Sequence, residues 1–85
     1  MKEEDQRLWN AIDEILWNDW DPIGINDIAP RNEYSSYTPI IYDLVINGAD
    51  KETIAIALDE IVTKRMVLIS NIEYNRRIAE LIINI

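Results

Sequence analysis

Residues 15–26 read ILWNDWDPIGIN, and this stretch marks the end of a helix and the start of a loop. Pro22 pushes the residue before it out of the helical region, so the preceding helix must end near Trp20. Gly24 permits backbone angles that other residues resist, and an indole ring such as that of Trp17 is costly to expose. We therefore predict a loop of fixed shape, either because it binds something or because its rings fill a core.

Apolar residues recur at helical spacing before this stretch and predict a first helix over about residues 4–19. The loop then covers residues 21–35 and carries two of the three prolines. A loop of about 15 residues is long for so small a domain, and such loops are often functional.

A second helix is predicted to begin near Ser36 and to end at Gly48. The side chain of Ser35, Ser36 or Thr38 can cap its start, and Pro39 is tolerated in its first turn. Gly48 is placed to adopt the left-handed conformation that commonly ends a helix.

Asp50 is the expected N-cap of a third helix, whose body covers residues 51–65. The pattern Ser70-x-x-Glu73 has the form of a capping box. We therefore predict a fourth helix over about residues 71–84.

The whole chain, residues 1–85, is predicted to be a single all-α domain of four helices with a structured loop between the first two. A short strand over residues 67–69 is the one predicted exception, because three consecutive apolar residues stand there. At 48% hydrophobic and 28% charged residues, the composition is that of a globular protein rather than a disordered one.

The sequence predicts a cytoplasmic location. It has no cysteine, which is typical of a reducing compartment. The start MKEEDQRL lacks the basic and apolar parts of a signal peptide. No apolar run approaches the roughly 20 residues that a membrane span requires, so we expect no membrane association.

The net charge is −8 and is unevenly distributed. Residues 1–60 contain 14 acidic and 4 basic residues, whereas residues 61–85 contain 2 acidic and 4 basic residues. A negative field repels phosphate backbones, so we expect no nucleic-acid binding. Two interpretations of the charge stay open: it provides solubility, or it forms an acidic face that attracts a basic partner.

Residue types argue against an enzyme. The chain has no histidine and no cysteine, so the commonest general base and the thiol nucleophile are both missing. The acidic pairs Asp13/Glu14 and Asp59/Glu60 are adjacent in sequence, so on a helix their side chains diverge and are expected to be solvated. We predict no catalytic residues and no cofactor.

Three loop acids, Asp19, Asp21 and Asp27, raise the question of a calcium site. On the EF-hand template Asp19 and Asp21 take positions 1 and 3, but Ile23 and Pro30 occupy two ligand positions. That match fails, and no metal site is predicted. A weak divalent-metal or small-ligand site formed by the loop carboxylates is an alternative.

Six aromatic residues surround the loop in sequence, and they have two interpretations. They fill the small core beneath it, or they form a partly exposed patch of the kind that anchors protein interfaces. On the second interpretation we predict that a partner contacts Trp17, Trp20, Asp21, Ile23, Tyr34 and Tyr37.

The runs LWNDWDPIGIND, EYSSYTPIIYDL and INGADKETIAIALDEI resemble a small family of uncharacterised bacterial proteins typified by YugE. The resemblance covers residues 16–68 and implies a compact helical domain in the cytoplasm, with no assigned activity and no catalytic residues. Members typically have Met-Gly-Leu where this chain has Met66-Val67-Leu68. Because valine lacks glycine's freedom at positive φ, we expect the turn after the third helix to differ here.

These observations together predict a small acidic, non-catalytic protein that binds another protein, which the charge suggests is basic. One alternative, by analogy of size and charge, is an immunity-type protein that neutralises a basic toxin domain. The apolar residues at the end of the fourth helix also suggest a homodimer through that helix; they are Leu81, Ile82, Ile83 and Ile85.

Overall fold

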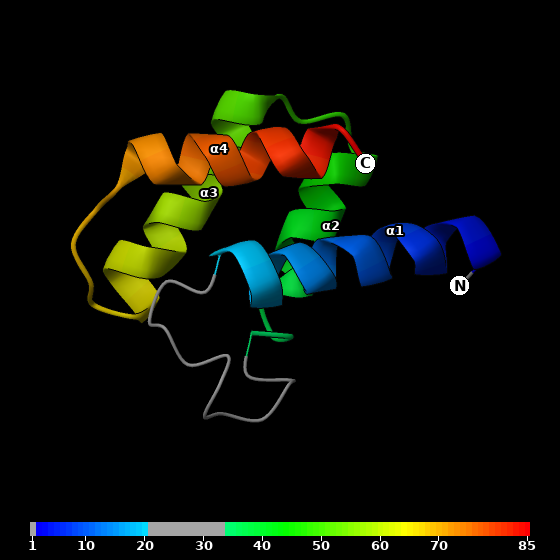
Figure 1. Cartoon of the computed structure of the whole chain (residues 1–85), viewed down its shortest axis with the longest axis horizontal. Coiled ribbons are helices and arrows are strands. Elements are labelled where there is room, and N and C mark those ends of the chain that lie inside the picture. Colours follow the sequence, from blue (N-terminus) through cyan, green and yellow to red (C-terminus); the bar gives the residue numbers. More distant parts are fainter. Residues whose placement is uncertain (1, 21–33) are drawn as a thin grey trace.

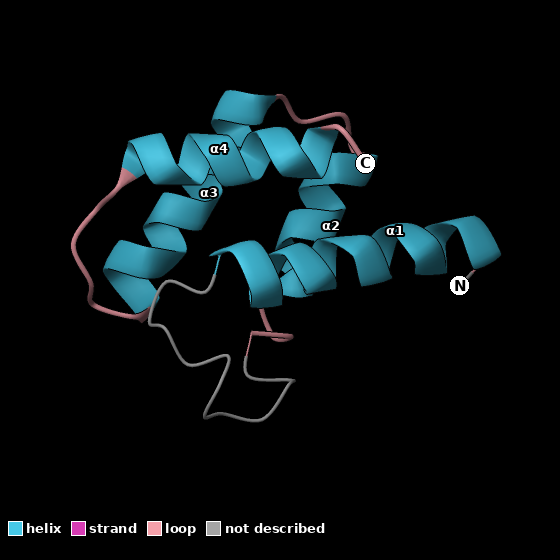
Figure 2. Ribbon diagram, in the orientation of Figure 1, coloured by secondary structure: helices cyan, strands magenta, loops and turns pink. Residues whose placement is uncertain are grey.

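The computed structural model describes residues 2–20 and 34–85. The described residues form four α-helices and no strand, so the all-α prediction is confirmed and the predicted strand over residues 67–69 is wrong (Figure 2). Two of the helices continue into a turn of π-helix. The elements are α1 (Glu3–Ile15), η1 (Leu16–Trp20), α2 (Thr38–Ile46), α3 (Lys51–Glu60), η2 (Ile61–Arg65) and α4 (Ile72–Ile83).

The helices pack in two directions. In Figure 1, α1 and α4 run across the view, and α2 and α3 run between them. The most extensive packing joins α3 to α4, and α1 packs against both α2 and α4. The N-terminal end of α1 extends beyond the other helices (Figure 1).

The core is formed by the apolar stripes of all four helices and of both π-helical turns. Ile12, Leu16 and Trp20 follow one another at a spacing of four residues, which places them on one side of the first helix. The other core side chains are Trp17, Tyr34, Ile41, Ile54, Ala55, Leu58, Ile61, Val62, Ile78, Ala79 and Ile82.

The first helix follows its prediction closely. The α-helical part and η1 together cover residues 3–20, against the predicted 4–19. The last turn is π-helical, a rare form that is often found at functional sites. In this turn the side chains of Leu16, Trp17 and Trp20 are all buried.

The start of α2 differs from its prediction. Pro39 lies in the first turn as expected, but no side chain caps the helix, and Tyr37 occupies the N-cap position. The hydroxyl groups of Ser35 and Thr38 instead donate to Oδ1 of Asp13 on α1, at 3.1 and 2.6 Å. An ionised carboxylate is a stronger hydrogen-bond acceptor than a neutral oxygen, so these two bonds help to hold the start of α2 against α1.

The end of α2 confirms the predicted glycine cap. Gly48 has a φ of +80°, in the left-handed region. Its N–H donates to Val45 O at 3.1 Å, and the N–H of Ala49 donates to Leu44 O at 3.0 Å. These two bonds form a Schellman motif, which satisfies the last carbonyls of the helix.

The third helix also agrees with its prediction. The side chain of Asp50 accepts a hydrogen bond from the Thr53 N–H at 2.8 Å and so caps α3. The α-helical part continues through η2, so the two together cover residues 51–65, as expected.

The connection into α4 brings two findings. Val67 has a φ of +54°, so this valine adopts the left-handed conformation that glycine favours. The predicted capping box is wrong: Asn71 is the N-cap and accepts a hydrogen bond from the Tyr74 N–H at 3.2 Å. The hydroxyl of Ser70 donates to Oδ2 of Asp59 on α3 at 2.7 Å.

An ion pair joins the start of α3 to α4. Arg76 donates from Nη2 to Oε1 of Glu52 at 2.9 Å and from Nε to the same atom at 3.2 Å. This hydrogen bonding lowers the pKa of the Glu52 carboxyl. The Thr53 N–H likewise lowers the pKa of Asp50.

Both shifts predict a loss of stability in acid. A carboxyl whose pKa is lowered by folding stabilises the protein fully above its ordinary pKa of about 4, and this stabilisation is lost as the pH falls through the lowered value. We expect Glu52→Gln to flatten the fall in the free energy of unfolding below about pH 4, as measured by urea denaturation across a pH series. Arg76→Gln should flatten it similarly. If the free energy of unfolding of both variants fell below pH 4 as steeply as that of wild type, this assignment would be contradicted.

Candidate functional site

The structure places the predicted partner-binding residues in three settings. Trp17, Trp20 and Tyr34 are buried in the core, and Tyr37 is half-buried. Asp21 and Ile23 lie outside the described residues.

The buried rings form one cluster. The centroid of the Trp20 ring lies 5.7 Å from that of Tyr34 and 6.0 Å from that of Tyr37, and the rings of Trp17 and Tyr34 are 5.8 Å apart. These contacts confirm that Trp17, Trp20 and Tyr34 fill the core. The alternative of an exposed patch at these three side chains is wrong, because burial leaves them almost no surface. Their use by a partner stays a prediction.

A chain of hydrogen bonds links the Trp20 indole to α3. Trp20 Nε1 donates to Oδ1 of Asn75 at 3.0 Å, and Asn75 Nδ2 donates to Oδ1 of Asp59 at 3.1 Å. The same carboxylate accepts the Asn71 N–H at 3.0 Å as well as the Ser70 hydroxyl. Trp20, Asn75 and Asp59 therefore join η1, α4 and α3 through a partly buried network of hydrogen bonds.

The expectation that the acidic pairs are solvated surface is wrong for one member of each pair. Asp59 and Asp13 are half-buried, and each accepts hydrogen bonds from side chains far away in sequence. The sequence does contain a signal for this network. Asn75 stands three residues before Ile78 and seven before Ile82, in the buried stripe of α4, where a polar side chain needs a partner.

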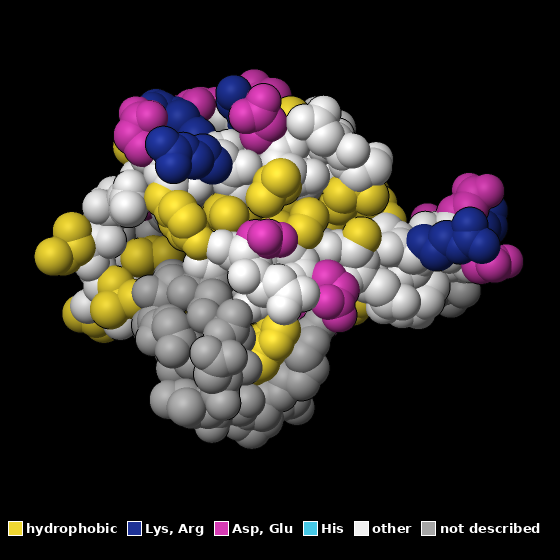
Figure 3. Space-filling view, viewed as in Figure 1, with side chains coloured by type: hydrophobic (Ala, Val, Ile, Leu, Met, Phe, Trp, Pro, Cys, Tyr) yellow, Lys and Arg dark blue, Asp and Glu magenta, His cyan; other side chains and the backbone are white. Residues whose placement is uncertain are grey.

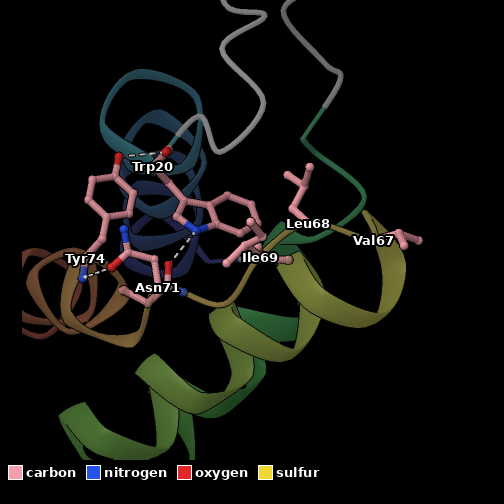
Figure 4. Close-up of a pocket in the computed structure, with 8 residues that line it drawn as sticks. Trp20, Val67, Leu68, Ile69, Asn71 and Tyr74 are labelled. Carbon is pink, nitrogen blue, oxygen red and sulfur yellow. Dashed lines mark hydrogen bonds between the residues drawn. The ribbon is translucent and has the colours of Figure 1, made fainter.

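A crevice opens beside this network and encloses about 520 Å³ (Figure 4). We call it the Val67 crevice. Figure 4 shows Trp20 and Tyr74 on one side and Val67 and Leu68 on the other. Its lining residues are Trp20, Val62, Val67, Leu68, Ile69, Asn71, Tyr74 and Asn75.

The rim of the Val67 crevice is unusually apolar and exposed. The side chains of Val67 and Ile69 are 82% and 91% exposed, and Leu68 is also exposed. In Figure 3, exposed hydrophobic side chains occupy the left edge of the molecule, where Figure 1 shows the segment that joins η2 to α4. Three consecutive apolar side chains in solvent are a feature that folding alone does not favour.

The polar side chains that line the crevice already make hydrogen bonds within the protein. The Tyr74 hydroxyl donates to the Trp20 carbonyl oxygen at 2.7 Å and also contacts the Asp19 carbonyl oxygen. The side chain of Asn71 caps α4, and that of Asn75 belongs to the Trp20 network. Among the described residues, no buried side-chain nitrogen or oxygen lacks a hydrogen-bond partner.

Val67 is strained as well as exposed. A β-branched residue in the left-handed region costs about 1–2 kcal/mol, because its Cβ approaches the following carbonyl. The turn is fixed by the Leu68 N–H, which donates to Val62 O at 2.9 Å. Since the Val67 side chain is exposed, little burial offsets this strain.

We expect Val67→Gly to raise the free energy of unfolding by about 0.5–1 kcal/mol. Glycine removes the strain, and its greater freedom in the unfolded chain offsets part of the gain. Ile69→Gly is the matched control, because Ile69 is equally exposed but does not have a positive φ. Urea denaturation should show a gain for the first variant and a small loss for the second. A loss for both would contradict the assignment of strain to Val67.

A second concave surface lies where α1, α2 and α3 meet, and we call it the Trp9 groove. It is more open than the Val67 crevice and encloses about 720 Å³. The rings of Trp9 and Tyr42 pack against each other, with centroids 5.2 Å apart. The lining residues are Trp9, Pro39, Ile40, Tyr42, Asp43, Leu44 and Ala57.

The described residues contain no group of three or more His, Cys, Asp or Glu side chains that could hold a metal ion. Of the three loop acids discussed above, only Asp19 is described, while Asp21 and Asp27 lie outside the described ranges. Within residues 2–20 and 34–85, no helix is both long and apolar enough to span a bilayer.

Comparison with known proteins adds no relative. No family model, curated protein or solved structure matches this chain. The resemblance to the YugE family therefore stays a prediction.

Proposed function

We propose that this chain is a non-catalytic protein-binding module and that an apolar segment of its partner binds at the Val67 crevice. The observation that carries this proposal is Val67 itself, which is strained and at the same time exposed. Strained residues persist where the surrounding structure enforces them, and they concentrate at functional sites.

The chemistry of the crevice favours an apolar occupant. The polar side chains that line it are hydrogen-bonded within the protein, so a ligand would gain little by bringing polar groups. Its rim, in contrast, presents Val67, Leu68 and Ile69 to solvent. Covering these side chains would remove apolar surface from water at about 25 cal/mol per Å².

The groups beside the crevice also support a non-catalytic role. A serine nucleophile is activated by an adjacent general base, most often histidine, and the chain has no histidine. The Ser70 hydroxyl beside the crevice donates to Asp59, and that carboxylate already accepts three hydrogen bonds.

The test compares proteins captured by immobilised wild type with those captured by Ile69→Ser and Ile56→Ser. Both isoleucines are exposed, but Ile56 lies on α3 and does not line the crevice. The proposal predicts a partner that wild type and Ile56→Ser retain and that Ile69→Ser loses. Equal capture by all three proteins would overturn the assignment to the crevice.

Self-association through α4 is a second candidate. Leu81 and Ile85 are 47% and 55% exposed. Leu81 lies in the last turn of α4, and Ile85 follows the C-cap Asn84. Figure 3 shows hydrophobic side chains gathered in a band along α4. Light scattering across a concentration series tests this candidate: a dimer that Leu81→Ser dissociates supports it, and a monomer throughout removes it.

A further inference from the structure

The Trp9 groove combines aromatic, apolar and acidic side chains. Trp9 and Tyr42 are half-buried, so part of each ring is accessible from the groove. Trp17 and Trp20 are buried, which makes Trp9 the most accessible indole of the three. Ile40, Leu44 and Ala57 supply the apolar part of the lining.

One carboxylate lines the groove, and a second stands one helical turn before Trp9. Asp43 lines the groove and is exposed. Asp5 stands one helical turn before Trp9 on α1, and its charge acts on Tyr42. Partial burial is the larger cause of the raised pKa of the Tyr42 hydroxyl, and the negative charge of Asp5 adds to it. Asp5 makes no side-chain hydrogen bond or ion pair with a described residue, so its carboxylate is available to a ligand.

The part of the chain that contains the groove also carries a net negative charge. Every residue that lines the groove belongs to residues 1–60, which carry 14 acidic and 4 basic side chains. Such a field raises the local concentration of cationic groups and repels anionic ones.

We infer that the Trp9 groove binds a basic segment of a partner protein. A Lys or Arg side chain lies against the Trp9 and Tyr42 rings, where it gains a cation–π interaction, and Asp5 and Asp43 pair with its charge. Apolar residues of the same segment cover Ile40 and Leu44. This surface shares no residue with the Val67 crevice, so the inference stands apart from the function proposed above.

The probe is a short amphipathic peptide of arginine and leucine, titrated into the isotopically labelled protein at low salt. We expect saturable binding that shifts the Trp9 indole N–H resonance and weakens steeply as salt is added. The double variant Asp5→Asn/Asp43→Asn should lower the affinity by about tenfold, because it removes both carboxylates beside the rings. Trp9→Leu should lower it by roughly five- to tenfold.

The matched control is Glu73→Gln/Glu80→Gln, which removes the same charge from α4, away from the groove. It should retain nearly all of the affinity, as should Ile69→Ser at the other surface. An equal loss in the two double variants would show attraction by net charge alone and would overturn the inference. It would also be overturned if the peptide did not bind, or if a peptide with glutamate in place of arginine bound equally well.

Discussion

Trp20→Ala should remove most of the protein's free energy of unfolding. The Trp20 side chain is completely buried, and its ring packs against those of Tyr34 and Tyr37. Truncation of a buried tryptophan costs about 3–5 kcal/mol. A domain of 85 residues without disulfides has a total stability on the order of 5 kcal/mol, so little would remain.

Circular dichroism and urea denaturation measure this effect, and two variants separate its causes. Trp9→Ala removes an indole that is only half-buried, so it should cost less than half as much. Trp20→Phe keeps an aromatic ring in the core but leaves Oδ1 of Asn75 without its donor, which should cost about 1–3 kcal/mol. If Trp20→Ala unfolded cooperatively at nearly the same urea midpoint as wild type, the Trp20 ring would not be a main source of the stability of the core.

Asp59→Ala should lower the free energy of unfolding by about 2–3 kcal/mol, the second largest effect that we expect. It removes the acceptor for the Asn75 amide, the Asn71 N–H and the Ser70 hydroxyl at once. Two of these groups lie where the chain enters α4, and Asn75 is itself buried. A buried donor without an acceptor loses the hydrogen bonds that it makes to water in the unfolded chain and gains none in the folded protein.

Glu60→Ala is the control for this prediction, because the neighbouring glutamate is exposed and should change stability by less than about 0.5 kcal/mol. Urea denaturation of both variants gives the comparison. Similar effects at positions 59 and 60 would show that the carboxylate of Asp59 does not organise the connection between α3 and α4.

The end of α2 and the start of α3 were predictable because local chemistry sets them. Gly48 ends α2 through its own backbone conformation, and Asp50 caps α3 through a bond to a residue three positions later. Such signals lie within a few residues of one another in sequence, so a single chain displays them.

The polar contacts that fix the arrangement of the helices were not predictable in the same way. Thr38 donates to a carboxylate 25 residues away, and Trp20 donates to an amide 55 residues away. In the sequence, Asp13 and Asp59 are typical of acidic residues on a helix surface. Only the packing of the helices brings hydroxyl and amide donors to their carboxylates.

The candidate surfaces were likewise only partly predictable from the sequence. Residues 67–69 have the composition of a strand, but the chain offers no neighbouring strand among the described residues, and their side chains are exposed. Trp9 and Tyr42 belong to the same group of aromatic residues as the predicted site, yet they line a groove while Trp17 and Trp20 enter the core. Composition identifies aromatic residues, and only packing decides which of them stay accessible.

The most direct test of the proposed function is partner capture by Val67→Gly, measured on protein whose free energy of unfolding is determined in parallel. If the side chain of Val67 serves binding, the variant should be more stable than wild type and should nevertheless capture markedly less partner. A variant that gains stability and captures as much partner as wild type would show that the exposed side chain of Val67 is not used, and it would contradict the account.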